Sequence, residues 1–461
     1  MQTKPISRLA LGVMLVLGAT QAGGQTYVNL VQGQGALVAG DFNRDGRPDL
    51  AVANRDSNSV SVLMGNGNGT FQTALTLGLN RKPYFLAAGD FNGDGKPDLV
   101  SRNEDDLSLW PGNGDGTFQS PRNINLPMRH HLLSAAYGWV AGAMAGDFNH
   151  DGRMDLAFTS RDRNDDYVLN VYLGQTDGTF DAKSTTTLYT FAPSTEALVV
   201  GDFDGDGNLD ARTAGVFGGF DGTPPMAMNL VRGKGDGTMF APVLTRVYGG
   251  TPAVLVAADC SSDGLLDFVV NATIWSTNAA YLGTALNTGT TNFQTLPIEV
   301  ENRPHALAIA DFNRDNRPDL LTLIHSDTNV GVLLGNGDGT FQASQSFPTG
   351  LSIPLVVAVA DFNGDGFPDA AIAGPTSANI AVLTNLNILA MPQFDAAFSV
   401  HSGGAFRGRL LGPPGQRQLI ERSSDFVSWV AIATNSAGVT PFNFTNTTAL
   451  PRAFYRARVI P

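Results

Sequence analysis

The sequence has a single cysteine and few charged or aromatic residues. Cys260 is the only cysteine among 461 residues, so the chain cannot form an internal disulfide. Charged residues make up 15% of the chain and aromatic residues 9%, whereas there are 53 glycines. This composition favours short strands joined by tight turns over helices. The 43% of hydrophobic residues is enough for a sizeable core, which argues against a disordered chain.

Beyond the N-terminus, the sequence lacks a hydrophobic run long enough to span a membrane. Near the N-terminus, Lys4 and Arg8 precede an apolar stretch from Leu9 to Ala19, which is too short to cross a bilayer. Small residues follow, among them Ala22 and Gly24. The pattern predicts a signal peptide over residues 1–24 and a secreted, extracellular protein that could stay associated with the cell surface. A membrane anchor is the alternative interpretation.

Positive charge is scarce. The 29 Lys and Arg residues face 42 Asp and Glu residues, which gives a net charge of −13 and argues against a nucleic-acid partner. Loss of Lys4 and Arg8 with the predicted signal peptide would change −13 to −15. Such self-repulsion indicates that counterions are built into the fold.

The sequence contains seven copies of an acidic segment with the pattern D-x-[ND]-x-D-G-x-x-D, followed with some variation. The copies recur with a period of roughly 50 residues, which is typical of one blade of a β-propeller. They begin at Asp41, Asp90, Asp147, Asp202, Asp259, Asp311 and Asp361.

A second motif, rich in Gly, Asn and Asp, follows each of the first six copies. Its residues supply the positive φ angles that tight turns need. The motif ends at Phe71, Phe118, Phe180, Phe240, Phe293 and Phe341.

Apolar and alternating stretches predict four strands in each repeat. In the first repeat they cover residues 36–40, 50–54, 59–64 and 70–77. Seven such units predict an all-β fold, a seven-bladed β-propeller over residues 25–390. The last repeat lacks an outer strand, so we expect residues 26–33 to pair with 380–388 and complete the seventh blade.

The acidic segments have the chemistry of a calcium site. Ca²⁺ binds six to eight hard oxygen ligands, and side chains at positions 1, 3, 5 and 9 with the carbonyl of position 7 supply them. An EF-hand is excluded because it needs Glu at position 12, where the first copy has Val52. A turn without metal is the alternative for a single copy. Three carboxylates in each of seven copies, with Asp204, nevertheless favour about six or seven Ca²⁺ ions.

The predicted ligands follow the same positions in every repeat. They are Asp41, Asn43, Asp45, Arg47 and Asp49; Asp90, Asn92, Asp94, Lys96 and Asp98; Asp147, Asn149, Asp151, Arg153 and Asp155; Asp202, Asp204, Asp206, Asn208 and Asp210; Asp259, Ser261, Asp263, Leu265 and Asp267; Asp311, Asn313, Asp315, Arg317 and Asp319; and Asp361, Asn363, Asp365, Phe367 and Asp369.

Two copies depart from the pattern. The copy over 259–267 has Ser261 at position 3 and Cys260 where most copies have Phe, so we expect its site to be the weakest. Cys260 is expected to fill the buried space of that Phe. Asn316 replaces Gly at position 6 and tolerates a left-handed conformation.

The combination DFNGDGxPDL and GNGDGTF resembles the FG-GAP (VCBS-type) repeat of integrin α-subunit propellers and their bacterial relatives, over about residues 26–390. The resemblance implies calcium loops on one face of the disc and ligand binding on the other. Propellers of this type are also similar to fungal lectins that bind sugars between blades and to some polysaccharide lyases.

Insertions indicate where a partner could bind. There are three: one between Phe118 and Asp147, before the third acidic segment, one at 161–166 and one at 213–229. In a propeller all three belong to the face opposite the calcium loops, which we therefore take as the candidate surface for a protein or glycan. Tolerated loop insertions are the alternative. The candidate residues are His130, His131, Tyr137, Trp139, Phe217 and Phe220.

The sequence contains none of the common catalytic motifs, so we expect a binding or adhesion scaffold and not an enzyme. A lectin with sugars between its blades and a polysaccharide lyase or hydrolase remain the alternatives. Residues 391–461 differ in composition from the repeats and predict a small β-sandwich-like module.

Overall fold

The computed structural model of the protein describes most of the repeat region and parts of the C-terminal module. The described residues are 26–29, 34–83, 85–103, 106–125, 143–162, 166–188, 197–216, 226–247, 251–274, 279–288, 293–300, 304–324, 328–352, 354–374, 379–384, 393–394, 400–402, 405–411, 417–424, 430–435, 442–446 and 454–460.

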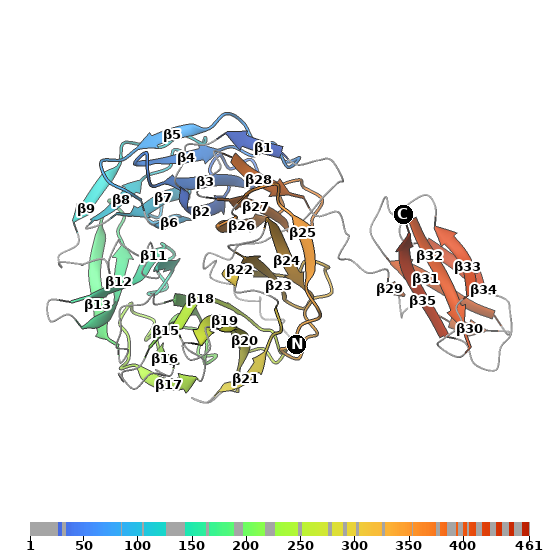
Figure 1. The fold of residues 1–461 in the computed structure, drawn as a ribbon. Helices are drawn as coiled ribbons and strands as arrows, with labels where there is room; N and C mark the ends of the chain where they lie inside the picture. The colour runs from blue at the N-terminus through green and yellow to red at the C-terminus, as the bar shows by residue number, and fades with distance from the viewer. Residues whose placement is uncertain are drawn as a thin grey trace, which may run out of the picture.

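Seven four-stranded antiparallel sheets are arranged as the blades of a ring (Figure 1), which confirms the predicted seven-bladed propeller. In blades one to three the strands are β2 (Gln34–Gly40), β3 (Asp49–Asn54), β4 (Ser59–Leu63) and β5 (Leu75–Gly78); β6 (Phe85–Gly89), β7 (Asp98–Arg102), β8 (Asp106–Trp110) and β9 (Arg122–Asn125); and β10 (Ala143–Gly146), β11 (Asp155–Arg161), β12 (Tyr167–Gly174) and β13 (Phe180–Thr187).

The remaining blades repeat the same order from the centre of the ring outward. Their strands are β14 (Ala197–Gly201), β15 (Asp210–Val216), β16 (Met226–Val231) and β17 (Val243–Val247); β18 (Thr251–Ala258), β19 (Asp267–Ile274), β20 (Ala279–Asn287) and β21 (Phe293–Pro297); β22 (Pro304–Ala310), β23 (Asp319–Ile324), β24 (Asn329–Leu333) and β25 (Gln345–Pro348); and β26 (Val356–Ala360), β27 (Asp369–Ala373), β28 (Asn379–Leu383) and β1 (Thr26–Asn29).

The ring closes between its two ends, as the sequence predicts. The N-terminal strand β1 pairs antiparallel with β28, with Thr26 opposite Val382 and Asn29 opposite Asn379. Blade seven therefore takes three strands from the end of the repeat region and its outer strand from the beginning. This pairing covers the edge of β28, which would otherwise present unpaired backbone groups.

One predicted strand boundary is wrong. The outer strand of blade one begins at Leu75 and not at residue 70. Phe71 instead forms an isolated bridge with Gly65, and the backbone N–H of Gln72 bonds to the Met64 carbonyl at 2.9 Å. The turn therefore extends further along the chain than the pattern of apolar residues indicates.

Aromatic residues of the two motifs join neighbouring blades. Phe42 of the first acidic loop packs edge-to-face on Phe118 of the second blade, with 5.7 Å between ring centroids. Phe91 and Phe180 make the same contact between blades two and three. Such aromatic pairs contribute beyond their buried area. The hydrophobic core consequently lies between blades and not within any one of them.

Blade four shows a second correction, because the motif phenylalanine is not Phe240. Met239 forms the bridge to Gly233 that the motif phenylalanine forms in blades one, two and six. Met239 is 7% exposed and belongs to the same hydrophobic cluster as Phe148, whereas Phe240 is 44% exposed. Between blades five and six, Cys260 is buried in a cluster against which Phe341 packs, in agreement with its predicted position. Burial raises the pKa of its thiol.

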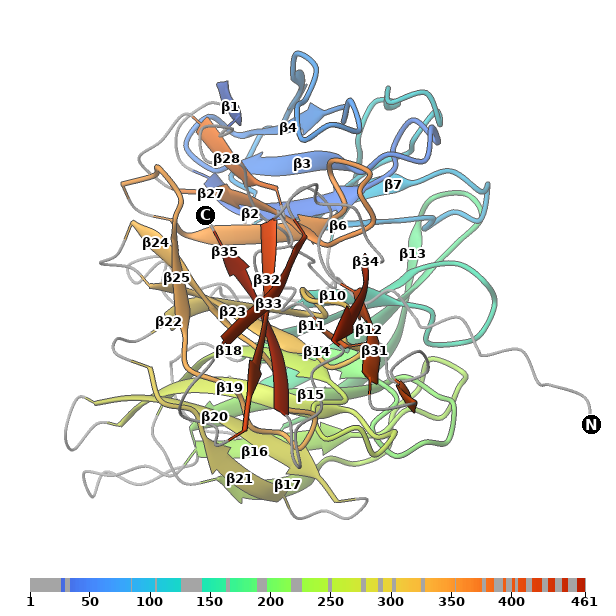
Figure 2. The same ribbon diagram turned by 90° about the vertical axis from the view of Figure 1, so that its right-hand side faces the viewer.

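Strands β29–β35 form two further small sheets (Figure 2). One contains β29 (Gln393–Phe394), β31 (Ala405–Leu411), β30 (Val400–Ser402) and β34 (Phe442–Asn446), and the other β33 (Val430–Asn435), β32 (Arg417–Ser423) and β35 (Phe454–Ile460). Ile420 and Phe444, one from each sheet, are buried. These strands are compatible with the predicted β-sandwich-like module. The proposed boundary between residues 390 and 391 lies outside the described residues.

The predicted signal peptide, residues 1–24, also lies outside the described residues. Within the described part of the chain, no helix is long and apolar enough to cross a membrane.

The first glycine of the turn motif is required for space. In blade two, a Cβ atom at Gly112 would lie 2.0 Å from the carbonyl oxygen of Pro97, which is backbone and cannot rotate away. We predict that Gly112→Ala destabilises the protein by about 1–3 kcal/mol, as overpacked sites do. Gly78→Ala is the control, because nothing lies within 4 Å of its Cβ position. Equal melting temperatures for the two variants in a thermal melt would contradict this interpretation.

Candidate metal centre

The seven acidic loops connect the first and second strands of their blades. Because all neighbouring strands in a blade are antiparallel, these loops and the turns between strands three and four lie at the same end of every blade. The connections from strand two to three and from blade to blade lie at the other end. The loops therefore form a ring on one face of the propeller.

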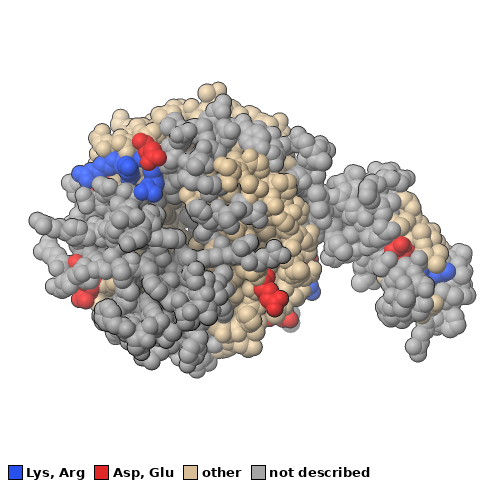
Figure 3. Space-filling view, viewed as in Figure 1, with Lys and Arg blue, Asp and Glu red and all other residues tan. Residues whose placement is uncertain are grey.

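Figure 3 shows one broad face of the ring. On its described surface, Lys and Arg and Asp and Glu form only small, separate groups, so no extended acidic field is visible on this side. The candidate partner residues His130, His131, Tyr137, Trp139, Phe217 and Phe220 all lie outside the described residues. Their placement on the face opposite the loops remains a prediction.

The backbone of each loop curls through left-handed conformations. Gly46, at position 6 of the first loop, has φ 82°, and Asn316 at the same position of the sixth loop has φ 64°. Asn316 thus adopts the conformation that its replacement of glycine requires. Position 4 is also left-handed, for example at Arg44 with φ 60°, although it is often not glycine. Such left-handed backbone conformations at residues other than glycine are maintained when internal hydrogen bonds fix the shape of the loop.

The carboxylate at position 1 supplies those bonds. In the first loop, Asp41 Oδ1 accepts the backbone N–H of Asp45 and Oδ2 accepts that of Gly46, both at 3.0 Å. The Asp45 Oδ1 in turn accepts the N–H of Arg47 at 2.9 Å. The loop therefore turns these side-chain oxygens toward its own backbone. Position 1 accepts the N–H of position 6 in all seven loops, through Asp41, Asp90, Asp147, Asp202, Asp259, Asp311 and Asp361.

The aspartate at position 9 links the two motifs of a blade. Asp49 Oδ2 accepts the N–H of Phe42 at 2.7 Å, and Oδ1 accepts that of Gly65, the first glycine of the turn, also at 2.7 Å. The bond to the turn recurs in blades two to six, through Asp98, Asp155, Asp210, Asp267 and Asp319. Sequence reasoning assigned position 9 to metal alone and missed this second role. The donor of this bond is glycine in blades one to four and six but Asn287 in blade five, so no single residue type signals it in the sequence.

Burial makes these carboxylates expensive to ionise without a cation. Asp155 is fully buried, and desolvation raises its pKa to about 7, with repulsion from Asp151 and Asp147 adding to the shift. Burial likewise raises the pKa of Asp210 to about 7, and Asp204 and Asp206 add to that shift. The carboxylates of one loop thus lie close enough to repel each other. A divalent cation would remove both the repulsion and the desolvation cost.

Four loops carry a cation of their own at position 7. Lys96 Nζ lies 2.9 Å from Asp94 Oδ2, and Arg47 and Arg317 pair with the position-5 carboxylates of their loops at 3.9 and 4.0 Å. Arg153 pairs with Asp151 in the same way. The sequence pattern predicts that these residues contribute only their backbone carbonyls to the metal site. In blade four the position is occupied by Asn208, which is neutral.

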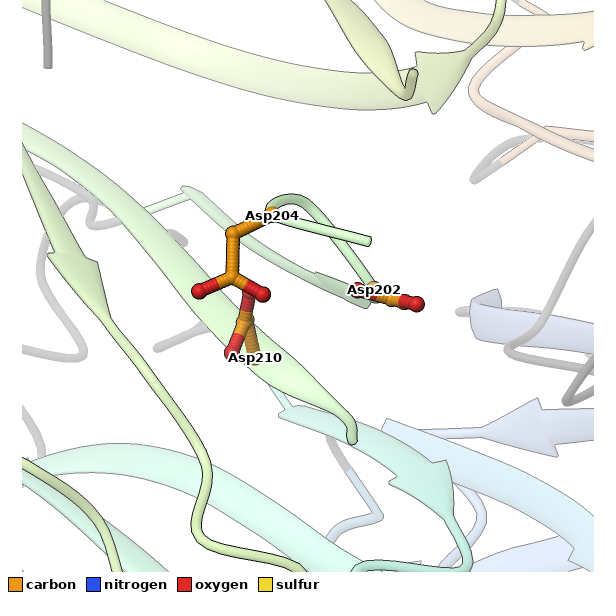
Figure 4. Close-up of side chains that lie close together, drawn as sticks. All are labelled: Asp202, Asp204 and Asp210. Carbon is orange, nitrogen blue, oxygen red and sulfur yellow. The ribbon is translucent and has the colours of Figure 1, made fainter. Parts of the chain in front are cut away.

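The loop of blade four brings its carboxylates closest together. Asp202, Asp204 and Asp210 each place an oxygen within 4.8 Å of the others (Figure 4), the one such group among the described residues. Two ligands on opposite sides of a Ca²⁺ ion are about 4.8 Å apart, given Ca–O distances of roughly 2.4 Å. The three oxygens therefore fit a shared calcium ion. A carboxylate oxygen that accepts an N–H retains further lone pairs for a metal.

The loop of blade five differs from the others as its sequence suggests. The shorter side chain of Ser261 replaces the Asn or Asp side chain found at position 3 of the other loops. The N–H of Ser261 bonds to Asp267 Oδ2 at 2.9 Å, as the N–H of Asn363 bonds to Asp369 in blade seven. The pKa of Asp267 is also raised, mainly by burial. We keep the prediction that this site binds calcium most weakly.

The raised pKa values predict an unusual pH dependence for the metal-free protein. Asp49 and Asp98 have folded-state pKa values of about 6, and Asp155, Asp210 and Asp319 about 7, against 3.8 for an unperturbed carboxyl. Between these values the folded state binds protons that the unfolded state does not, so stability rises as pH falls. In EDTA we expect the melting temperature to increase from about pH 7.5 to about pH 5. A flat or opposite trend in thermal melts would contradict the predicted shifts.

Comparison with known proteins agrees with the geometry of the repeats. A family model described as an FG-GAP-like repeat matches residues 41–101, 90–158, 147–211, 259–322 and 311–372, which together cover more than half of the chain. No curated protein matches the sequence.

Two solved structures are similar in fold only. One is a lectin of Agrocybe aegerita described as recognising non-reducing terminal N-acetylglucosamine, with 16% identity, coverage of 80% of this chain and 96% of that chain, and a TM-score of 0.47. The other is the Tc holotoxin pore of Photorhabdus luminescens, with 13% identity, coverage of 78% of this chain and 19% of that chain, and a TM-score of 0.38. At these values neither likeness carries an argument about what the chain binds.

Proposed function

Because the chain belongs to the FG-GAP-like repeat family, we propose that it is a secreted, calcium-binding β-propeller scaffold that binds a protein or glycan through the face opposite its acidic loops. The proposal assigns it a binding role and no enzymatic activity. The observation that carries the calcium part is the set of buried position-9 carboxylates, six of which are repelled by other carboxylates of their own loops. When bound, calcium supplies the positive charge that compensates the negative charge of these carboxylates.

The structure of the loops supports a role for calcium in stability. The position-9 carboxylate already joins the acidic loop to the turn between strands three and four, for example through Phe42 and Gly65. An ion held by positions 1, 3, 5 and 9 would add a second link at the same point. Binding to the folded state alone stabilises it in proportion to the logarithm of the ligand concentration. Calcium would thus make the propeller a rigid platform.

The calcium part of the proposal has a direct test. We expect EDTA at neutral pH to lower the melting temperature markedly and added Ca²⁺ to restore it. Asp202→Asn should reduce the size of this calcium response, because it removes from the cluster in blade four the position-1 carboxylate that every loop has. Asp56→Asn, an exposed residue in a turn at the other end of blade one, is the matched control and should respond as the wild type does. A melt unaffected by EDTA and Ca²⁺ would exclude the proposed ions.

The binding part depends on the opposite face, where the long connections end. The segments proposed for this surface are residues 126–142, between β9 and β10, and residues 217–225, between β15 and β16. Shortening them should leave the blades intact while changing the surface of blades two to four.

We expect the full chain in calcium to bind a component of a glycan array or of a panel of extracellular proteins. The variant with both segments shortened should lose that binding while its melting temperature and its calcium response stay unchanged. Undiminished binding by the folded variant would place the partner site elsewhere on the molecule.

A further inference from the structure

Blade four carries an exposed aromatic residue beside its acidic loop. Phe240 follows Met239, which fills the buried place of the motif phenylalanine, and its N–H bonds to the Arg232 carbonyl at 2.8 Å. Its side chain is 44% exposed, and it is the one aromatic residue of the described chain among the exposed large hydrophobic side chains. The ring is therefore partly accessible to solvent at the end of the tight turn.

Two cations contact this ring. The guanidinium carbon of Arg232 lies 5.3 Å from the ring centroid of Phe240, and the ammonium nitrogen of Lys234 lies 5.0 Å from it. Both distances are within the range of cation–π attraction. Arg232 is also held by Asp204, at 3.5 Å between Nη1 and Oδ2. Both cations are exposed, so they present positive charge to solvent beside the ring.

The other repeats show that this combination is specific to blade four. The residue that corresponds to Phe240 is Gln72, Gln119, Asp181 and Gln342 in blades one, two, three and six. Arg232 corresponds to Met64, Pro111, Leu173 and Leu334, and Lys234 to Asn66, Asn113, Gln175 and Asn336. The turn folds in the same way in all of these blades, so its structure does not require the three residues of blade four.

Charges of both signs lie near this turn, because Asp204 pairs with Arg232 and Asp236 lies near Lys234. The hydrogen bonds from Thr238 lower the pKa of Asp236 most, and Lys183, on the outer strand of blade three, and Lys234 lower it further, so both of these charges lie near Asp236. Asp236 Oδ1 accepts hydrogen bonds from the N–H and the hydroxyl of Thr238, at 2.9 and 2.6 Å. Arg232 and Lys234 thus contact the ring itself, and Lys183 adds a third cation near the same turn.

We propose that Phe240, Arg232 and Lys234 form a binding site for an anionic saccharide on the calcium-loop face of blade four. The exposed ring offers apolar area to the C–H groups of a sugar, and the two cations bind its carboxylate or sulfate group. A neutral sugar would leave the cations unused, and a purely ionic polymer would leave the ring unused. This site is distinct from the partner surface proposed on the opposite face and does not depend on it.

The test measures binding of the full chain to immobilised polysaccharides in calcium. The probes are polygalacturonate for carboxylate, dextran sulfate for sulfate, neutral dextran, and polyglutamate as an acidic polymer without sugar rings. We expect binding to polygalacturonate or dextran sulfate, with the stronger of the two identifying the anion, and at least about tenfold weaker binding to dextran and polyglutamate.

Substitutions taken from the other repeats provide the variants. Phe240→Gln should weaken binding about tenfold, and Arg232→Leu with Lys234→Asn should also reduce the salt dependence of binding. Lys82→Asn, an exposed cation at the other end of the blades, is the control and should bind as the wild type does. Melting temperatures confirm that each variant is folded.

Three results would overturn the proposal. The first is no binding of either anionic polysaccharide by the wild type, and the second is unchanged binding by a folded Phe240→Gln variant. The third is equal binding of polyglutamate, which would show a site for acidic polymers in general. None of these results bears on the calcium response or on the opposite face.

Discussion

The buried carboxylate at position 9 of each acidic loop is the constraint on which the blades depend. All seven of these aspartates have no exposed surface, and in six blades one oxygen binds the loop while the other binds the turn between strands three and four. Such a group stabilises the blade only if its charge is compensated or its proton retained. The same residue therefore fixes the local fold and, when it is ionised, leaves a buried negative charge to be compensated.

The contacts between blades follow from that arrangement. Once the loop and the turn are joined within a blade, the turn of the next blade is positioned against the loop. Gly116 N–H then reaches the Phe42 carbonyl at 3.1 Å, and Gly69 N–H reaches the Phe362 carbonyl at 2.8 Å across the point of ring closure. Phe71 packs on Phe362 at the same junction, with 5.6 Å between ring centroids. The ring is held by a repeated pair of contacts, which explains why its end blades join as its inner blades do.

Most of the fold was predictable, because a fixed period imposes it. The repeat count follows from the spacing of the acidic segments, the strand order from the apolar and alternating stretches between them, and the closure by residues 26–29 from the missing outer strand of the last repeat. The misplaced outer strand at residue 70 and the misassigned Phe240 arise where turn geometry, and not hydrophobicity, decides the structure. The close approach of Gly112 to Pro97 could not be predicted from the sequence, because it depends on a contact between residues that lie far apart in the chain. The same holds for the second role of the position-9 aspartates, the hydrogen bond to the turn between strands three and four. The candidate partner residues fall outside the described chain and stay predictions.

The central claim is that the buried position-9 carboxylates are compensated by calcium. The most direct measurement is the number of calcium ions bound per chain, obtained by mass spectrometry of the intact folded protein after removal of free metal. The account predicts about six or seven ions, one for each loop with the weakest site in blade five. A folded chain that retains none, at calcium concentrations that saturate extracellular sites, would contradict it.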